Sequence, residues 1–338
     1  MRDRYGRDID YLRISITDKC NLRCKYCMPG DIDHLPMSEL LTYEEISYIT
    51  GIAVSCGIKR IKITGGEPLV RRGCCKLIKI LKDIPGIEEV TITTNGVLLE
   101  ERLEELRKAG IDGINISIDT LDPERYERIT GADELDRVLR GMDKACDCGI
   151  RVKINAVSVD WSGLGDDKCR TGIDTYENAC ELISLSRDRN IDVRFIEMMP
   201  IGSGKDFMAV SHDMLIPAVK GRYPGIVRDD RRHGNGPSVY YRIPGHKGSV
   251  GFISAIHGPF CDFCNRIRLT SQGYLKSCLC FDTGVDLKAL IRSDRPDILK
   301  KEAIRKGIEE TILCKPKAHS FTKGDDITEK HAMSVIGG

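Results

Sequence analysis

The sequence lacks long hydrophobic runs, an excess of charge of either sign, and repeated or low-complexity segments. No apolar stretch reaches the ~18 residues needed to span a bilayer, so we expect no membrane-spanning helix. The start, MRDRYGRDID, is charged and has no apolar core, which argues against a secretory signal. The formal net charge is +1, so no global field attracts nucleic acid or an anionic membrane. We therefore expect a cytoplasmic protein that holds any anionic ligand with local Arg and Lys.

Cysteine, in contrast, is abundant, with 15 in 338 residues. In an oxidising compartment this number would suggest disulfides. Without an export signal, the clustering of some of these cysteines favours metal ligation in a reducing cytosol. The scattered ones are expected to be small structural residues: Cys56, Cys74, Cys75, Cys146, Cys148, Cys169, Cys180 and Cys314.

Residues 11–198 alternate short β-rich runs with amphipathic helical runs. The strand candidates are 11–16, 60–64, 89–94, 113–118, 152–159 and 192–197, and the helix candidates lie near 43–56, 74–83, 98–109, 134–148 and 175–189. This alternation predicts parallel βαβ units and an α/β fold built on a partial (β/α)6 TIM-like barrel. We expect the barrel over residues 1–200 and a C-terminal α+β extension that closes it over 201–338. Irregular hairpins are expected at 226–250, and a Gly-rich loop at 160–174.

Cys20, Cys24 and Cys27 follow the first predicted strand with a C-x3-C-x2-C spacing. In barrel sheets, ligands gather at the carboxyl ends of the strands, and this loop lies at that end. Three thiolates on one loop can hold three irons of a cubane iron–sulfur cluster. The fourth iron is then open to a small molecule that receives an electron. A structural zinc site is the alternative, but it normally needs a fourth ligand, for which His34 is the nearest candidate.

A second group contains Cys261, Cys264 and Cys278 in a C-x2-C-x13-C spacing. Two interpretations stay open on spacing alone. The three thiolates can hold a second cluster, or Cys280 can join them as the fourth ligand of a closed tetrahedral zinc site. The zinc interpretation leads to a different class of protein, a zinc-ribbon binding protein without catalysis.

The segment Thr64-Gly65-Gly66-Glu67-Pro68 follows the second predicted strand. Its two glycines permit close approach of backbone to a ligand, and the carboxylate of Glu67 can accept hydrogen bonds from an ammonium group. A simple tight turn is the alternative interpretation.

Three cations, Arg13, Lys62 and Lys153, fall inside predicted strands. A charged residue inside a strand is costly unless it is paired, which favours a ligand-binding role. Arg in particular binds phosphate oxygens in pairs. The fragment GSGK (202–205) lacks the spacing of a P-loop and is not counted as a phosphate site.

These motifs resemble the radical S-adenosylmethionine enzymes and, within them, the GTP 3′,8-cyclase family, which starts molybdenum cofactor biosynthesis. The resemblance rests on YLRISITDKCNLRCKYCMP (11–29), ITGGEPLVRR (63–72), TTNG (93–96), RFIEMMP (194–200), FCDFCNRIRLTSQGYLKSCL (260–279), DLKALIR (286–292) and the terminal MSVIGG. It covers nearly the whole chain and implies a partial barrel of the radical S-adenosylmethionine type.

The resemblance implies two [4Fe–4S] clusters, one on Cys20, Cys24 and Cys27 and one on Cys261, Cys264 and Cys278. It implies S-adenosylmethionine contacts at Tyr26, Gly66, Ser117 and Met199. It implies GTP contacts at Arg13, Lys62, Thr93, Lys153, Arg266, Ile267 and Arg268. It also implies that the terminal Gly337 and Gly338 reach the active site and take part in catalysis.

In the implied reaction, a 5′-deoxyadenosyl radical removes hydrogen from C3′ of GTP, and C3′ then bonds to C8 of the guanine. The implied partners are an external electron donor and cyclic pyranopterin monophosphate synthase, which would take the product. The chain is expected to act as a monomer or homodimer. The nearest alternative is a peptide-modifying radical enzyme with an auxiliary cluster, which would not need the run NRIR (265–268) between its auxiliary ligands.

Overall fold

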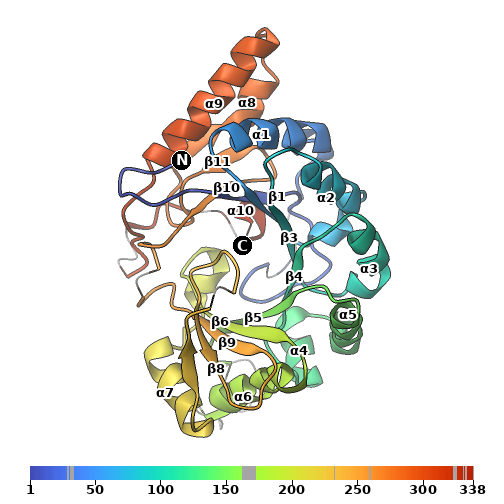
Figure 1. The fold of residues 1–338 in the computed structure, drawn as a ribbon, viewed down its shortest axis with the longest axis vertical. Helices are drawn as coiled ribbons and strands as arrows, with labels where there is room; N and C mark the ends of the chain where they lie inside the picture. Colours follow the sequence, from blue (N-terminus) through green and yellow to red (C-terminus); the bar gives the residue numbers. More distant parts are fainter. Residues whose placement is uncertain are drawn as a thin grey trace.

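The computed structural model describes residues 1–28, 30, 34–161, 173–231, 233–258, 260–322, 326–329, 331 and 333–337. Within these residues the strands form a single sheet in the order β12-β11-β10-β1-β2-β3-β4-β5-β6-β9-β8-β7. Figure 1 shows this sheet curling around a central space, with most helices on its outer side. None of the described helices combines the length and the apolar character that crossing a bilayer requires.

The first six strands are parallel neighbours and confirm the six predicted strands. They are β1 (Tyr11–Ser15), β2 (Arg60–Thr64), β3 (Glu89–Thr94), β4 (Gly113–Ser117), β5 (Val152–Ser158) and β6 (Ile191–Glu197). The predicted helices are confirmed as α1 (Tyr43–Ser55), α2 (Cys74–Lys82), α3 (Leu99–Lys108), α5 (Leu135–Asp147) and α6 (Ile173–Asp188). The structure adds α4 (Pro123–Thr130), which the sequence analysis missed. Its signals are the capping Asp122, Pro123 in the first turn and the left-handed Gly131 at its end.

The chain beyond residue 200 lengthens the same sheet at both edges. Strand β9 (Ser249–Ile253) pairs in parallel with β6, and β10 (Arg266–Leu269) pairs in parallel with β1. Antiparallel hairpins then follow: β8 (Val239–Arg242) with β7 (Val227–Asp229), and β11 (Tyr274–Lys276) with β12 (Gly284–Asp286). The predicted hairpins at 226–250 are confirmed. Among the described strands β9 and β10 do not pair, so the barrel stays partial, with an open seam between them.

Further 3-10 turns and helices complete the described fold. They are the short 3-10 turns η1 (Met37–Glu39), η2 (Pro68–Val70) and η3 (Gly202–Asp206) and the helices α7 (His212–Arg222), α8 (Leu287–Ile291), α9 (Asp297–Leu313) and α10 (Met333–Ile336). Figure 1 shows α10 inside the ring of strands, whereas α8 and α9 extend beyond α1. The two predicted regions therefore share one sheet, and the boundary near residue 200 stays a prediction.

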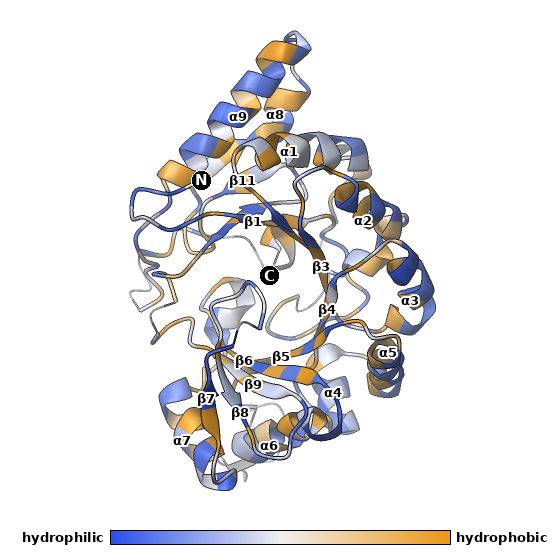
Figure 2. Ribbon diagram, viewed as in Figure 1, coloured by the Kyte–Doolittle hydropathy of each residue, from blue (hydrophilic) through white to orange (hydrophobic). Residues whose placement is uncertain are grey.

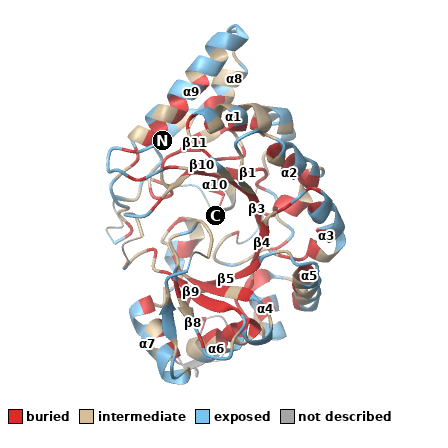
Figure 3. Ribbon diagram, viewed as in Figure 1, coloured by how far each residue is buried: buried red, intermediate tan, exposed pale blue. Residues whose placement is uncertain are grey.

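The strands divide their side chains between two environments, because successive residues point to opposite faces. Leu12, Ile61 and Ile267 belong to the hydrophobic core under the helices and are fully buried. Arg13 and Lys62, on the alternate positions, face the interior. Figure 2 shows hydrophilic and hydrophobic residues alternating along the strands, and Figure 3 shows that most residues of the parallel strands are buried. The interior face of the sheet is therefore polar and shielded from bulk water.

Candidate active site

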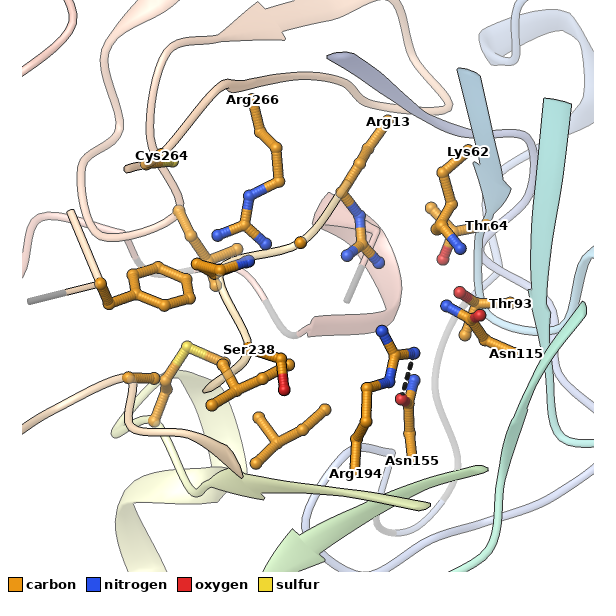
Figure 4. Close-up of a pocket in the computed structure, with 18 of the residues that line it drawn as sticks. Arg13, Lys62, Thr64, Thr93, Asn115, Asn155, Arg194, Ser238, Cys264 and Arg266 are labelled. Carbon is orange, nitrogen blue, oxygen red and sulfur yellow. Dashed lines mark hydrogen bonds between the residues drawn. The ribbon is translucent and has the colours of Figure 1, made fainter. Parts of the chain in front are cut away.

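The curled sheet encloses a chamber of about 640 Å³. Both predicted cysteine sets line it: Cys20, Cys24 and Cys27 on one loop, and Cys261, Cys264 and Cys278 from the C-terminal region. Polar side chains on the inward positions of the strands line the space between them, and several of these are drawn in Figure 4. The sequence analysis could place the first set at the carboxyl end of β1, but only the strand order brings the second set to the same chamber.

The loop of the first cysteine set is held by close backbone contacts with the TGGEP turn. Gly66 N donates to Thr17 O (2.7 Å), and Glu67 N donates to Lys19 O (2.8 Å). A Cβ atom on Gly66 would lie 2.4 Å from Lys19 O. Only glycine permits this approach, so the turn fixes the start of the cysteine loop while Gly66 itself lines the chamber.

The sequence suggested that the Glu67 carboxylate could bind an ammonium group of a ligand, but the structure gives it other partners. Its side chain is fully buried and accepts from Leu69 N (2.9 Å), Thr94 Oγ1 (2.8 Å) and Asn95 N (2.6 Å). Burial raises the pKa of this carboxyl to about 7, although the three hydrogen bonds oppose the shift. Glu67 therefore joins the TGGEP turn to the end of β3, and it is not among the residues that line the chamber.

The four residues predicted to contact S-adenosylmethionine all line the chamber: Tyr26, Gly66, Ser117 and Met199. The hydroxyl of Tyr26 donates to Asp119 Oδ2 (2.8 Å), and Asp119 Oδ1 accepts from Val157 N (2.8 Å). Burial raises the pKa of Asp119 to about 6, opposed by these hydrogen bonds. The Tyr26 ring also contacts Trp161, with 5.9 Å between the ring centroids. The orientation of Tyr26 is thus set by the protein itself.

The second cysteine set is surrounded by positive charge. The guanidinium of Arg7 donates to Cys261 O (2.8 Å) and, on its other side, to Pro316 O (2.6 Å), which ties this loop to the C-terminal segment. Burial raises the pKa of the Cys264 thiol, but Arg266 and Lys315 outweigh burial and hold that pKa at about 6. A thiol of such low pKa is a thiolate at neutral pH, which is the form that ligates metal.

Cys280 lies beside this set, since Cys278 packs against the same apolar cluster. It is buried in a small apolar cluster with Ile201, Leu279 and Phe321 and does not line the chamber. Burial raises the pKa of its thiol to about 11, so it stays protonated at neutral pH. Cys280 thus differs from the three other cysteines in that its side chain is directed away from the chamber.

The spacing of the thiols also bears on the choice between zinc and a cluster. With Zn–S bonds of about 2.3 Å, the sulfurs of a tetrahedral zinc site lie about 3.8 Å apart. In the described part of the chain, the group of His, Cys, Asp and Glu atoms that gathers within 4.8 Å is Asp282, Glu329 and His331, and it contains no cysteine. A cubane does not need such a close group, because each thiolate binds a different iron. The donor sets therefore fit two three-thiolate clusters.

Cations converge on the space between the cysteine sets. Figure 4 shows Arg13, Lys62, Arg194 and Arg266 pointing into the same region. Burial, and then the charges of Arg266 and Arg194, lower the pKa of Arg13 to about 10 against an opposing effect of Tyr11. Burial and the neighbouring arginines hold the pKa of Lys62 well below its usual value.

The lowered pKa of Lys62 marks buried positive charge in the chamber. Arg268 is buried, and burial together with Arg13 and Arg266 lowers its pKa well below the usual value. Among the described residues, no carboxylate forms an ion pair with Lys62, Arg194 or Arg268. Buried charges need a partner, so the chamber is suited to a ligand that carries several negative charges.

Arg194 is the member of this group that the sequence analysis missed. Its Nη2 donates to Asn155 Oδ1 (2.5 Å), as the dashed line in Figure 4 shows. With its amide oriented to suit its neighbours, Asn115 Oδ1 accepts from Lys62 Nζ (2.6 Å) and Arg194 Nη2 (2.9 Å). The signal was available, because Arg194 is a charged residue on the inward face of a predicted strand, as Arg13 and Lys62 are.

The other predicted GTP contacts differ in their surroundings. Thr93, Lys153 and Arg266 line the chamber. Lys153 is already paired, since its Nζ lies 2.7 Å from Asp192 Oδ2 and 3.1 Å from Tyr240 Oη. Ile267 packs in the hydrophobic core, so its side chain at that place cannot reach a ligand in the chamber.

The C-terminal tail enters the chamber side of the sheet. Gly337 has a positive φ of 76°, and its carbonyl accepts from Arg268 Nη1 (2.6 Å). A Cβ atom at Gly337 would lie 3.0 Å from Thr64 Cγ2 and 3.1 Å from Ser15 Cβ, at the ends of β2 and β1. The predicted catalytic Gly338 lies outside the described residues.

Comparison with known proteins gives a consistent result. The chain matches the Radical SAM superfamily over residues 14–161 and Molybdenum Cofactor Synthesis C over residues 191–321. It is 41% identical over 339 residues to the GTP 3′,8-cyclase of Clostridium perfringens strain 13, covering 100% of both chains. It is 37% identical over 341 residues to the GTP 3′,8-cyclase of Ectopseudomonas mendocina, covering 99% of this chain and 98% of the other.

Solved structures share the fold at lower identity. Streptococcus suis SuiB bound to S-adenosylmethionine aligns with a TM-score of 0.65 at 15% identity, over 96% of this chain and 76% of the other. The same protein bound to its precursor peptide SuiA aligns with a TM-score of 0.62 at 15% identity, over 96% and 75% of the two chains. At this identity the likeness concerns the fold alone, and it agrees with a partial barrel.

Proposed function

The chain belongs to the GTP 3′,8-cyclase family of radical S-adenosylmethionine enzymes, and we propose on that premise that its chamber converts GTP to (8S)-3′,8-cyclo-7,8-dihydroguanosine 5′-triphosphate. This reaction is the first step of molybdenum cofactor biosynthesis. The cofactors are two [4Fe–4S] clusters and S-adenosylmethionine. One observation carries the proposal: two separate sets of three thiols face the same chamber across a group of buried cations.

At one side of the chamber, Cys20, Cys24 and Cys27 would hold the first cluster. When bound, this cluster and S-adenosylmethionine supply the radical that removes hydrogen from C3′ of GTP. The chain's own part is to hold the cofactor in place: Tyr26, oriented by Asp119, offers an aromatic face, and Gly66 lines the chamber beside the cysteine loop. Ser117 and Met199 complete this side of the chamber.

At the other side, Cys261, Cys264 and Cys278 would hold the second cluster, with one iron left for the guanine. Arg13, Lys62, Arg194, Arg266 and Arg268 would bind the triphosphate. Fixing the nucleotide at its base and at its phosphates leaves the ribose between them, where C3′ can meet both the radical and C8. The contribution of the protein is thus positioning, which can supply a large part of a rate enhancement.

The group of cations favours this function over the alternatives. A zinc-ribbon protein has no need for buried cations between its cysteine sets. A peptide-modifying enzyme shares the fold, but its substrate does not carry the clustered negative charge that Arg194 and Lys62 require. The family identity points the same way.

The remaining assignments follow from the function. We place the reaction in the cytoplasm, because thiolate ligands need a reducing compartment. An external electron donor would reduce the first cluster, and the product would pass to cyclic pyranopterin monophosphate synthase. A monomer or homodimer would serve equally, because both cysteine sets come from one chain.

The test uses protein purified without oxygen and reconstituted with iron and sulfide. We expect about eight irons and eight sulfides per chain, the content of two [4Fe–4S] clusters. With GTP, S-adenosylmethionine and a chemical reductant, the cyclised nucleotide and 5′-deoxyadenosine should form together. Cys264→Ser should lose one cluster, whereas Cys148→Ser, at an exposed cysteine outside the chamber, should keep both. Bound zinc without sulfide, or 5′-deoxyadenosine formation without use of GTP, would contradict the proposal.

A further inference from the structure

We propose that the buried ion pair between Lys276 and Glu329 anchors the C-terminal tail, so that Gly337 is delivered to the chamber. The tail is defined here as residues 326–329, 331 and 333–337. Lys276 and Glu329 are then positioning residues, because they act through the tail and touch neither substrate nor cofactor. The inference rests on the proposed function, since the tail has a task only if the chamber is the active site.

Both carboxylate oxygens of Glu329 have partners, although the residue lies near the end of the chain. Its side chain is fully buried, and one carboxylate oxygen contacts the ammonium of Lys276, which is 1% exposed. The other oxygen accepts from His331 N (2.7 Å) and lies 2.9 Å from His331 Nδ1. The backbone N–H of Glu329 donates to Cys280 O (3.2 Å). Terminal segments are generally poorly ordered unless such contacts tie them down.

A second carboxylate completes the anchor. Asp282 Oδ1 lies 3.1 Å from Lys276 Nζ, and Asp282 N donates to Thr328 Oγ1 (2.9 Å). Asp282, Glu329 and His331 also lie close enough together to hold a metal ion. Lys276 already supplies positive charge to both carboxylates, so the cluster is explained without a metal.

The anchor and the chamber belong to the same hairpin. Lys276 on β11 is the cross-strand partner of Arg268 on β10, and Arg268 donates to Gly337 O. One hairpin therefore holds the tail at two points, Glu329 and Gly337. Between these points, Ile336 packs in the apolar cluster that contains Cys280. Cys278 follows Lys276 by two residues, so the second cysteine set and the tail anchor are fixed relative to each other.

Loss of one partner would loosen the tail. Replacing Glu329 leaves the ammonium of Lys276 buried without its main counter-charge, which is strongly unfavourable. The apolar contacts of Ile327, Met333 and Ile336 and the hydrogen bond from Glu329 N to Cys280 O remain. The unpaired buried charge nevertheless favours conformations in which Lys276 reaches water, and in these conformations Gly337 is held less firmly at Arg268.

The effects on kcat and on KM for GTP should distinguish a defect in the tail from a defect in GTP binding. Arg268 loses Gly337 as an acceptor but keeps its charge for the triphosphate. For Glu329→Gln we therefore expect kcat for the cyclised nucleotide to fall about tenfold or more, with KM for GTP changed less than about threefold. Asp282→Asn should have a smaller effect of the same kind, because Asp282 is half exposed.

The experiment uses the reconstituted enzyme with both clusters, and it measures kcat, KM for GTP and hydrogen exchange of the tail. The double variant Lys276→Met/Glu329→Leu replaces the buried pair by apolar side chains, an exchange that is often tolerated. It should restore slow exchange in the tail and more than half of the lost kcat. The matched control is Glu309→Gln, which removes an exposed ion pair with Arg305 on α9 and should change nothing.

Three results would overturn the anchor. The first is unchanged kcat and tail exchange in Glu329→Gln. The second is a loss of kcat while the tail stays protected, and the third is a double variant with a protected tail and no recovery of kcat. Failure of the wild-type protein to use GTP would instead overturn the proposed function, and the exchange measurement would still decide whether Lys276 and Glu329 hold the tail.

Discussion

Replacing Arg194 by Gln should move stability and substrate use in opposite directions. Without nucleotide, the Arg194 charge helps to lower the pKa of Arg13 and Lys62, which means that it repels their charged forms. Gln keeps an amide that can bond to Asn155, but it removes this repulsion. The protein without nucleotide should therefore unfold at a higher temperature than the wild type.

With GTP bound, the same charge is favourable. A hydrogen bond to a charged group contributes about 1.5–3 kcal/mol. Since about 1.4 kcal/mol corresponds to a factor of ten, KM for GTP should rise about tenfold to a hundredfold. Arg194 is only 8% exposed, so solvent does little to screen this interaction. Formation of 5′-deoxyadenosine without GTP should be unchanged, because Arg194 is not among the residues assigned to the first cluster or to S-adenosylmethionine.

The assay combines thermal unfolding of the reconstituted, nucleotide-free enzyme with anaerobic steady-state kinetics. The matched control is Arg189→Gln, which removes a partly exposed ion pair with Asp143 outside the chamber and should leave KM unchanged. A lower unfolding temperature together with an unchanged KM would refute the reasoning, because Arg194 would then be a structural residue.

Other changes should separate the two sides of the chamber. Arg266→Ala should mainly raise KM for GTP and leave 5′-deoxyadenosine formation intact; unchanged GTP turnover would show that the assignment of Arg266 is wrong. Cys24→Ala should abolish 5′-deoxyadenosine formation and leave about four irons per chain, as iron analysis would show. Cys280→Ala should keep about eight irons, whereas a zinc site with Cys280 as ligand would lose its metal. The pKa of Lys62 is lowered, so the fraction of neutral Lys62 increases as pH rises through a value well below 10.5. Because the triphosphate favours the charged form, KM for GTP should rise with pH over this range. A Lys62→Arg variant should show a flatter dependence of KM on pH.

The strands and the first half of the site could be predicted because their signals are local. Arg13 and Lys62 interrupt apolar runs, and the period of two places them opposite the core residues Leu12 and Ile61. The same period places Ile267 on the core side, between two arginines that face the chamber.

The features that could not be predicted from the sequence depend on the order of the strands in the sheet. Asp192 precedes Arg194 by two residues and stands on the same face of β6, so the sequence offers Arg194 a partner. In the structure, Asp192 pairs with Lys153 on the neighbouring strand instead, and Arg194 keeps its charge for the chamber. The hydrogen bond between Glu67 and Thr94 on β3, and the pairing of β9 with β6 and of β10 with β1, are likewise set by distant parts of the chain.

The seam between β9 and β10 affects how much the interior can hold. A closed barrel of eight strands has an interior just wide enough for side chains or one small ligand. Here β9 and β10 form the two rims of the seam and do not pair with each other. The antiparallel hairpins extend the sheet outward from them, so the two rims can move apart without breaking a strand pairing. The segment that bridges the rims carries Cys261 and Cys264. Any widening of the seam is therefore transmitted directly to the loop that carries Cys261 and Cys264, so the width of the barrel and the position of this loop are coupled.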